Sequence, residues 1–186
     1  MSQTEELELI ALWKTGDRAA FGKLYDGYVR KIYDFIYYKT HHRETAQDLT
    51  ADTFTKALAA AERFDPVRGT FQSWLYRIAR NTVIDYYRTK KEVQDVDDVW
   101  DLSDDTNIAQ DTQTRLKVEE VKNYLEKLKP DQRDIVIMRV WQDLSFREIA
   151  EIVGKSEAAS KMAYSRAIRQ LRKDMPLALL LIMLLP

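Results

Sequence analysis

Two segments of the chain are rich in residue types that bind nucleic acid. Between Arg77 and Lys91 five basic residues accompany one acid, and between Lys155 and Lys173 six basic residues accompany one acid. Lysine and arginine neutralise phosphates, an asparagine amide can pair with a base edge, and tyrosine rings can stack on unpaired bases. The formal net charge of −1 therefore does not argue against nucleic-acid binding, because the charge is segregated along the chain. The two segments predict contact with DNA at two places.

A helical wheel at about 100° per residue divides the first basic segment into two faces. The face predicted to pack in the core holds Phe71, Trp74, Leu75, Ile78 and Thr82. Another face holds Arg77, Arg80, Asn81, Arg88 and Lys91, with Ile84 among them and Tyr86 and Tyr87 nearby. Taken alone, this pattern also fits a solvated charged helix face.

The second basic segment is predicted to form a helix-turn-helix. Ser145 to Glu148 has the form of a capping box, and Gly154 supplies the turn. In the helix that follows, the inward positions are Ser160, Tyr164, Ala167, Ile168 and Leu171, and the outward positions are Lys161, Met162, Ser165, Arg166, Arg169, Arg172 and Lys173. A recognition helix needs this division into a packed face and a basic face. An ordinary helical hairpin is the alternative, and the spacing and cap favour DNA binding.

The elements that would position these side chains are all predicted to be helices. Only 5 Gly and 4 Pro interrupt 186 residues, and apolar residues recur at helical spacing. Asp17, Thr70 and Ser156 are suited to cap helices, and Pro130 to begin one. Helices are predicted over 5–14, 18–39, 45–62, 71–91, 114–128, 130–142, 145–153 and 157–173.

Residues 93–112 are predicted to form an acidic, flexible linker between two small helical domains. Eight acids and no Lys or Arg lie between Glu92 and Asp111, without a helical period. The predicted organisation is an amino-terminal domain over 1–92, the linker over 93–112, a helix-turn-helix domain over 113–174 and an apolar tail over 175–186.

Catalysis and cofactor binding have little support in the sequence. The chain has no cysteine, which excludes disulfides and thiolate metal sites. No nucleophile–base constellation and no Gly-rich phosphate loop is recognisable. His41-His42 could suggest a metal site, but we interpret the pair as a surface turn. The linker acids could suggest a calcium site, but they lack the central Gly and terminal Glu of an EF-hand loop. The prediction is a protein that is not an enzyme and binds no metal or cofactor. The acidic start lacks a signal-peptide pattern and indicates a cytoplasmic protein.

Three motifs in order resemble the extracytoplasmic-function group of bacterial RNA polymerase sigma factors. Residues 46–54 (AQDLTADTF) are similar to the helix with which that family docks on the polymerase clamp. Residues 68–81 (RGTFQSWLYRIARN) resemble its promoter-melting segment, and residues 144–172 resemble its reader of the upstream promoter element. The resemblance extends to about Lys173.

The resemblance implies a protein that binds core RNA polymerase and directs it to promoters. Contacts to the polymerase would come from Asp48, Leu49, Asp52 and Phe54. The melted non-template strand of the −10 element would contact Arg68, Gly69, Thr70, Phe71, Arg77, Arg80, Asn81 and Arg88. The duplex −35 element would contact Ser156, Lys161, Met162, Ser165, Arg166 and Arg169. An anti-sigma factor is a further implied partner, and no small-molecule substrate is implied.

The sequence departs from the family pattern at several positions. Gln47 stands where the family usually has an acid, and Ala51 where it has a polar residue. In the recognition helix, Met162 replaces a small polar residue, and Ala163 removes an expected phosphate contact. The promoter sequence therefore cannot be transferred from the family.

Two other function classes stay open at this point. An autonomous helix-turn-helix repressor would explain the second basic segment but not the first, and a helical interaction module would explain neither. Promoter binding with and without core polymerase distinguishes the three classes. A repressor binds duplex DNA by itself, a sigma factor binds a promoter only with core polymerase, and an interaction module binds neither DNA nor polymerase.

The apolar tail over 175–186 carries no charged side chain, and at twelve residues it is too short to cross a bilayer. Because exposed apolar surface promotes association, the tail is expected to pack back onto the protein. It would either complete the carboxyl-terminal core or occupy a groove between the domains and compete with polymerase or DNA.

Overall fold

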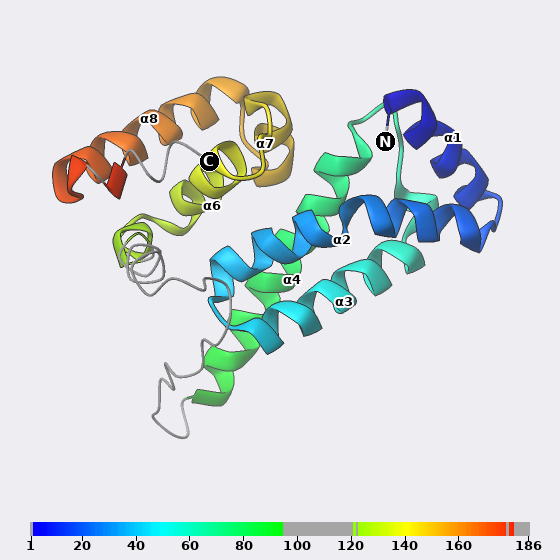
Figure 1. The fold of residues 1–186 in the computed structure, drawn as a ribbon, viewed down its shortest axis with the longest axis horizontal. Coiled ribbons are helices and arrows are strands. Elements are labelled where there is room, and N and C mark those ends of the chain that lie inside the picture. Colours follow the sequence, from blue (N-terminus) through cyan, green and yellow to red (C-terminus); the bar gives the residue numbers. More distant parts are fainter. Residues whose placement is uncertain (1, 95–120, 122, 178, 181–186) are drawn as a thin grey trace. The chain divides into compact units, whose positions relative to one another are not determined.

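The computed structural model describes residues 2–94, 121, 123–177 and 179–180, and every regular element in these ranges is a helix (Figure 1). This confirms the all-α prediction. The chain divides into two compact units, Met1–Asp101 and Leu102–Pro186.

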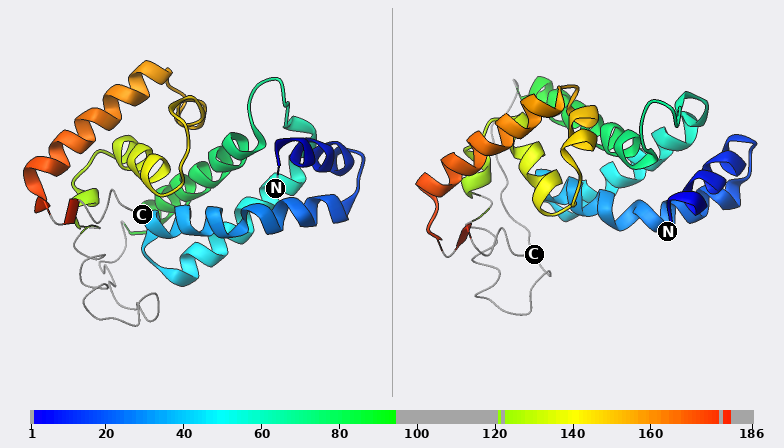
Figure 2. Two further views of the ribbon diagram at one scale, coloured as in Figure 1. Left: turned by 45° about the horizontal axis from the view of Figure 1, so that its top comes forward. Right: turned by 90° about the horizontal axis from the view of Figure 1, so that it is seen from above.

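The amino-terminal unit has four α-helices and one short 3-10 helix: α1 (Gln3–Lys14), α2 (Arg18–Thr40), α3 (Arg43–Ala59), η1 (Ala61–Arg63) and α4 (Phe71–Gln94). Helices α2, α3 and α4 pack alongside one another, and α1 packs against α2 (Figures 1 and 2). Helix α2 begins at the predicted cap, where the Asp17 carboxylate accepts hydrogen bonds from the amides of Ala19 and Ala20 at 2.8 and 3.2 Å.

Helix α3 begins two residues before the predicted start. The Nδ1 atom of His42 accepts a hydrogen bond from the Thr45 amide at 3.2 Å, so His42 caps the helix. His41 ends α2 in the left-handed conformation, with φ of 52°. The two histidines therefore form the predicted turn between α2 and α3.

Aromatic rings fill one end of the amino-terminal core. Trp13 of α1 lies 6.0 Å from Phe71 of α4, and Phe64 lies 5.7 Å from the same ring, centroid to centroid. The Lys14 ammonium donates to the Phe64 carbonyl at 3.0 Å, which fixes the segment before α4 against α1. The packing of these rings sets the position of α4 relative to α1.

The buried face of α4 is wider than the wheel predicted. Phe71, Leu75 and Thr82 are buried as expected, while Trp74 and Ile78 are only partly buried. Four further residues of this helix are buried, namely Ser73, Tyr76, Ala79 and Val83. The difference arises because α4 packs against both α2 and α3, so two adjoining faces of the helix are covered.

The carboxyl-terminal unit contains α6 (Pro130–Val140), α7 (Phe146–Val153) and α8 (Glu157–Asp174). Pro130 occupies the first turn of α6, and the predicted capping box of α7 is present, with Ser145 and Glu148 bonding reciprocally. Gly154 ends α7 with φ of 69°, a conformation that favours glycine. Ser156 then caps α8 by accepting from the Ala159 amide at 3.1 Å. These local signals produce the predicted helix-turn-helix.

The start of the apolar tail belongs to the core of this unit. Met175, Leu179 and Leu180 are buried in one cluster with residues of the preceding helices, namely Val121, Leu125, Leu128, Val136, Ala167, Ile168 and Leu171. The Leu180 amide donates to the Pro176 carbonyl at 3.1 Å, which closes a helical turn. The tail was expected to pack either on the carboxyl-terminal core or in a groove between the domains. Its described residues pack on the carboxyl-terminal core.

Several predictions fall wholly or largely outside the described residues. These are the linker over 93–112, most of the helix over 114–128, and the end of the tail from residue 181. Among the described helices, none combines the length and apolar content that a bilayer crossing requires. The described residues also contain no cluster of three or more potential metal ligands.

Candidate nucleic-acid and polymerase interfaces

Helix α3 presents two carboxylates on its outer side. Asp48 is exposed, and Asp52 is partly buried beside Lys56, whose Nζ lies 2.8 Å from the carboxylate. The same ammonium donates to the Thr82 hydroxyl of α4 at 3.2 Å. Asp52 is thus held in place through Lys56, while Asp48 faces solvent. The pair can meet a basic surface of a partner.

Leu49 and Phe54 do not share that outer surface, which corrects their prediction as direct polymerase contacts. Both are buried in the amino-terminal core, where Phe54 packs against Phe21 and Tyr25. They were selected because they stand inside the family-like motif, but an amphipathic helix buries such positions. Tyr25 and Leu58 are the large apolar residues that stay exposed on α2 and α3, and neither was predicted as a surface residue.

The loop between η1 and α4 is a compact turn organised by Asp65. Its carboxylate accepts a hydrogen bond from the Val67 amide at 3.0 Å and lies 3.4 Å from the Arg68 guanidinium. Val67 is 92% exposed in this turn, and so large an exposure of an apolar side chain was not predicted from the sequence. Thr70 is exposed and caps α4 by accepting from the Ser73 amide at 3.1 Å, and Gly69 is partly buried.

Phe71 is the one residue of the predicted −10 group that the structure places in the core. Its ring is almost fully buried, against the rings of Trp13, Tyr28, Phe64 and Trp74. A ring packed against four others is not free to stack on a base. Its assignment as a DNA contact is therefore corrected to a core role at the start of α4.

The predicted basic face of α4 is accessible. Arg77, Asn81 and Arg88 are exposed, and Arg80 is partly buried. The Arg88 guanidinium lies 3.0 Å from the Asp85 carboxylate one turn earlier. The side chain of Lys91 lies outside the described residues. The tyrosines near this face are held in place, since the Tyr87 hydroxyl donates to the Lys39 carbonyl of α2 at 3.0 Å and the Lys90 ammonium lies 5.9 Å from the Tyr86 ring.

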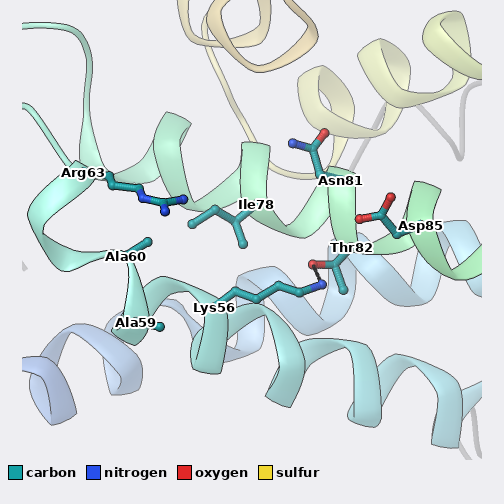
Figure 3. Close-up of a pocket in the computed structure, with 8 residues that line it drawn as sticks. All are labelled: Lys56, Ala59, Ala60, Arg63, Ile78, Asn81, Thr82 and Asp85. Atoms are coloured by element: carbon teal, nitrogen blue, oxygen red, sulfur yellow. Dashed lines mark hydrogen bonds between the residues drawn. The ribbon is translucent and has the colours of Figure 1, made fainter.

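Asn81 lines a pocket of about 400 Å³ between α3 and α4 (Figure 3). The α3 side and η1 contribute Lys56, Ala59, Ala60 and Arg63, and α4 contributes Ile78, Asn81, Thr82 and Asp85. The pocket combines an amide, two cations and a carboxylate with the apolar side chain of Ile78. This mixture suits a planar group that carries hydrogen-bond donors and acceptors next to a negative charge, as a nucleotide does.

Helix α8 carries the second candidate surface. All six residues predicted to contact the −35 element are exposed, namely Ser156, Lys161, Met162, Ser165, Arg166 and Arg169. Met162 is 55% exposed, a large apolar group on an otherwise polar face. The inward residues Ser160, Ala167, Ile168 and Leu171 are buried, and Tyr164 is partly buried. The division into a packed and a basic face is therefore present.

Two titratable groups of α2, the Asp34 carboxyl and the Tyr38 hydroxyl, have raised pKa values. Burial raises the pKa of the Asp34 carboxyl above its ordinary value, and the Arg30 guanidinium at 3.9 Å lowers it by less. Burial also raises the pKa of the Tyr38 hydroxyl, with a further contribution from the Asp34 charge. Folding therefore favours the protonated form of both groups, and keeping Asp34 ionised at neutral pH costs stability.

Two family profiles match the chain, one in each unit. Residues 24–93 match sigma-70 region 2, and residues 119–171 match sigma-70 region 4. The first range contains α4 with its pocket, and the second contains α8 with its basic face.

Two relatives that match across both units agree with these profiles. The chain is 33% identical over 178 residues to the ECF RNA polymerase sigma factor BldN of Streptomyces coelicolor, covering 91% of this chain and 66% of that protein. It is 34% identical over 168 residues to the RNA polymerase sigma factor YlaC of Bacillus subtilis, covering 85% of this chain and 93% of that protein.

Solved structures show the same fold. The sigma factor RpoE in complex with the anti-sigma factor NepR, from Bartonella quintana, matches with a TM-score of 0.68 at 28% identity, covering 82% of this chain and 94% of that one. CnrH in complex with the cytosolic domain of CnrY matches with a TM-score of 0.73 at 24% identity, covering 92% of this chain and 97% of that one.

Proposed function

The chain belongs to the extracytoplasmic-function group of RNA polymerase sigma factors, which direct promoter-specific transcription initiation, and from this premise we propose how its residues divide the work. The amino-terminal unit binds core polymerase and the melted −10 element. The carboxyl-terminal unit reads the −35 element as duplex. The proposed domain roles are those predicted for residues 1–92 and 113–174.

Asp48 and Asp52 are the proposed contacts to core polymerase. Their carboxylates lie one helical turn apart on the outer side of α3, where they can pair with basic groups of the partner. Leu49 and Phe54 act indirectly in this proposal, because their burial fixes the outer face of α3.

The pocket beside Asn81 is the proposed site for an unpaired base of the −10 element. Flipping a base out of the stack costs unpairing and unstacking energy, and a pocket that binds the flipped base offsets part of that cost. The Asn81 amide offers both a donor and an acceptor to a base edge, while Lys56 and Arg63 attract the phosphates on either side. Arg68, Gly69, Thr70, Arg77, Arg80 and Arg88 would hold the strand around this pocket.

The exposed face of α8 is the proposed reader of the −35 element. An α-helix fits the major groove of B-DNA, where base edges carry distinguishable donor and acceptor patterns. Lys161, Ser165 and Arg166 supply polar contacts, and Met162 offers an apolar contact to a thymine methyl group. Ser156 and Arg169 lie at the two ends of this face.

An anti-sigma factor is a proposed additional partner, because the RpoE relative is solved in complex with one. Phosphodiester bond formation is proposed to belong to the polymerase, and the chain to act as a non-catalytic initiation factor. The proposed site of action is the cytoplasm, where bacterial transcription takes place.

The observation that carries this proposal is a polar surface pocket beside Asn81 in one unit and a basic helix face on α8 in the other, on a chain that matches sigma-70 regions 2 and 4. Gel-shift titration of promoter fragments with and without core polymerase tests it. We expect sequence-specific binding only when core polymerase is present. Tight duplex binding by the protein alone would support a repressor instead.

A further inference from the structure

The carboxyl-terminal unit has a second pocket, of about 510 Å³, where three of its segments meet. Lys129 and Asp131 line it from the amino end of α6, Lys155 from the turn between α7 and α8, and Ala163 and Arg166 from α8. Neither Lys129 nor Lys155 is among the residues predicted to contact the −35 element, although Lys155 begins the second basic segment. All the lining residues lie in one unit, so the pocket is a feature of that unit alone.

Positive charge dominates this pocket. Lys129, Lys155 and Arg166 are all exposed cations, and one carboxylate, that of Asp131, opposes them. The Lys155 ammonium lies 2.6 Å from the Asp131 carboxylate, so these two charges largely compensate each other. Within the described part of this unit, neither Lys129 nor Arg166 forms an ion pair with an acid, and the positive end of the α6 dipole adds to their field. The pocket therefore favours an anion.

The place of the pocket on α8 indicates which anion. An α-helix with its side chains is about 10–12 Å across, and the major groove is about 12 Å wide, so an inserted helix fills the groove. Residues on the flanks of the helix then face the phosphate walls of the groove, and residues at its tip face the bases. Ala163 and Arg166 are three residues apart on one flank, and Ala163 has too short a side chain to fill the space beside Arg166.

We propose that this pocket binds one phosphate of the duplex backbone next to the bases that α8 contacts, with Lys129 and Arg166 as its cations. Lys129 reaches the phosphate from α6, and Asp131 weakens the binding by repelling the phosphate and by pairing with Lys155. The inference rests on the proposed −35 contact and extends it to an element outside the helix-turn-helix. The pocket contributes affinity rather than base preference, because phosphates are alike in every sequence.

Salt dependence of promoter binding by the holoenzyme tests the proposal. Each phosphate that a cation neutralises releases counterions and contributes about 0.9 to the slope of log affinity against log salt. Lys129→Gln should lower the slope by about that amount, and weaken binding by the same factor on promoters with intact and with mutated −35 elements. Lys127→Gln is the matched control, since Lys127 is an exposed lysine of the same unit outside the pocket, 4.7 Å from the Tyr124 ring.

A second variant predicts the opposite change. Asp131→Asn removes the repelling charge and releases Lys155, so it should tighten promoter binding and steepen the salt slope. Thermal unfolding of Lys129→Gln should stay near that of the wild type, because Lys129 is exposed just before α6. Asp131→Asn should lower the melting temperature only slightly, because the ion pair with Lys155 that it loses is partly exposed to solvent.

Different outcomes would contradict the phosphate site and the proposed promoter-binding function on which it rests. A salt slope for Lys129→Gln equal to that of Lys127→Gln, or weaker binding by Asp131→Asn, would overturn the phosphate site while wild-type holoenzyme still bound promoters. Failure of the wild-type protein to direct core polymerase to any promoter would overturn the proposed function itself.

Discussion

Asn81 and Arg166 are proposed to meet DNA in different forms, and single substitutions can separate the two contacts. Asn81 lines a surface pocket between α3 and α4, whereas Arg166 lies on the exposed face of the proposed recognition helix α8. A pocket of this kind can accept a base only after the base has left the stack, and a basic helix face accepts an intact duplex.

Asn81→Ala is expected to impair strand opening roughly tenfold, since a good base contact is worth about 1–3 kcal/mol. Permanganate reactivity of the −10 thymines should fall more than the affinity of the closed complex.

Arg166→Ala should instead weaken closed-complex binding and flatten its salt dependence, because a phosphate or base contact is lost. Asn123→Ala, a surface asparagine of the other unit, serves as control for the amide loss. If both substitutions gave the same defect, the division between melted and duplex DNA would be wrong.

Asp34 provides a pH-dependent test at the same scale. Burial raises the pKa of this carboxyl, so folding favours its protonated form, and the stability that this form contributes is lost as the pH rises through its titration range. Asp34→Asn should therefore raise the melting temperature slightly at pH 7. The difference in melting temperature between the variant and the wild type should vanish at a pH below the ordinary pKa of aspartate, where wild-type Asp34 is also neutral. Thermal unfolding followed by circular dichroism at both pH values measures this, and a lower melting temperature for the variant at pH 7 would contradict it.

At the scale of elements, α3 combines a buried face that holds the unit together with an outer face that is proposed to bind polymerase. Asp48→Lys with Asp52→Lys should abolish most core binding, because two attractive contacts become repulsive. Folding should change little, since the Asp52–Lys56 pair, with 45% of each side chain exposed, contributes only about 0.3–0.5 kcal/mol. Co-purification with core polymerase measures the binding, and Asp26→Lys on the exposed side of α2 controls for the reversal of a surface charge elsewhere in the unit. Undiminished co-purification would remove α3 from the proposed interface.

Local sequence signals predicted most of the helices because caps and turns are determined by neighbouring residues. Asp17, Ser145, Gly154 and Ser156 all act as predicted. The early start of α3 was missed because histidine is an uncommon helix cap, although its ring nitrogen serves the same purpose here. The amphipathic period also identified the exposed faces of α4 and α8.

The errors concern residues whose surroundings depend on distant parts of the chain. Leu49, Phe54 and Phe71 were assigned to interfaces from motif position, whereas packing against other helices buries them. Tyr76 was not recognised as core, because the wheel does not show that α4 is covered by two helices at once. Neither pocket was predictable from spacing, since each is lined by residues about 20 to 40 positions apart.

At the scale of the whole molecule, the tail is part of the carboxyl-terminal unit. Deleting Leu177–Pro186 removes Leu179 and Leu180 from its core. Because a buried leucine typically contributes about 2–5 kcal/mol, the deletion should lower the stability of this unit markedly. Thermal unfolding and promoter-dependent transcription of the truncated chain measure the effect. Higher transcription with unchanged stability would instead identify the tail as an inhibitor.

Transcription by purified core polymerase on sheared genomic DNA from the source organism, with RNA 5′ ends mapped, tests the proposed function most directly. Addition of the protein should create new 5′ ends, preceded by shared −10 and −35 elements at a constant spacing. The Asp48→Lys, Asp52→Lys variant should create few of them. A 5′-end map that the protein leaves the same as that of core polymerase alone would contradict its role as a promoter-specificity factor.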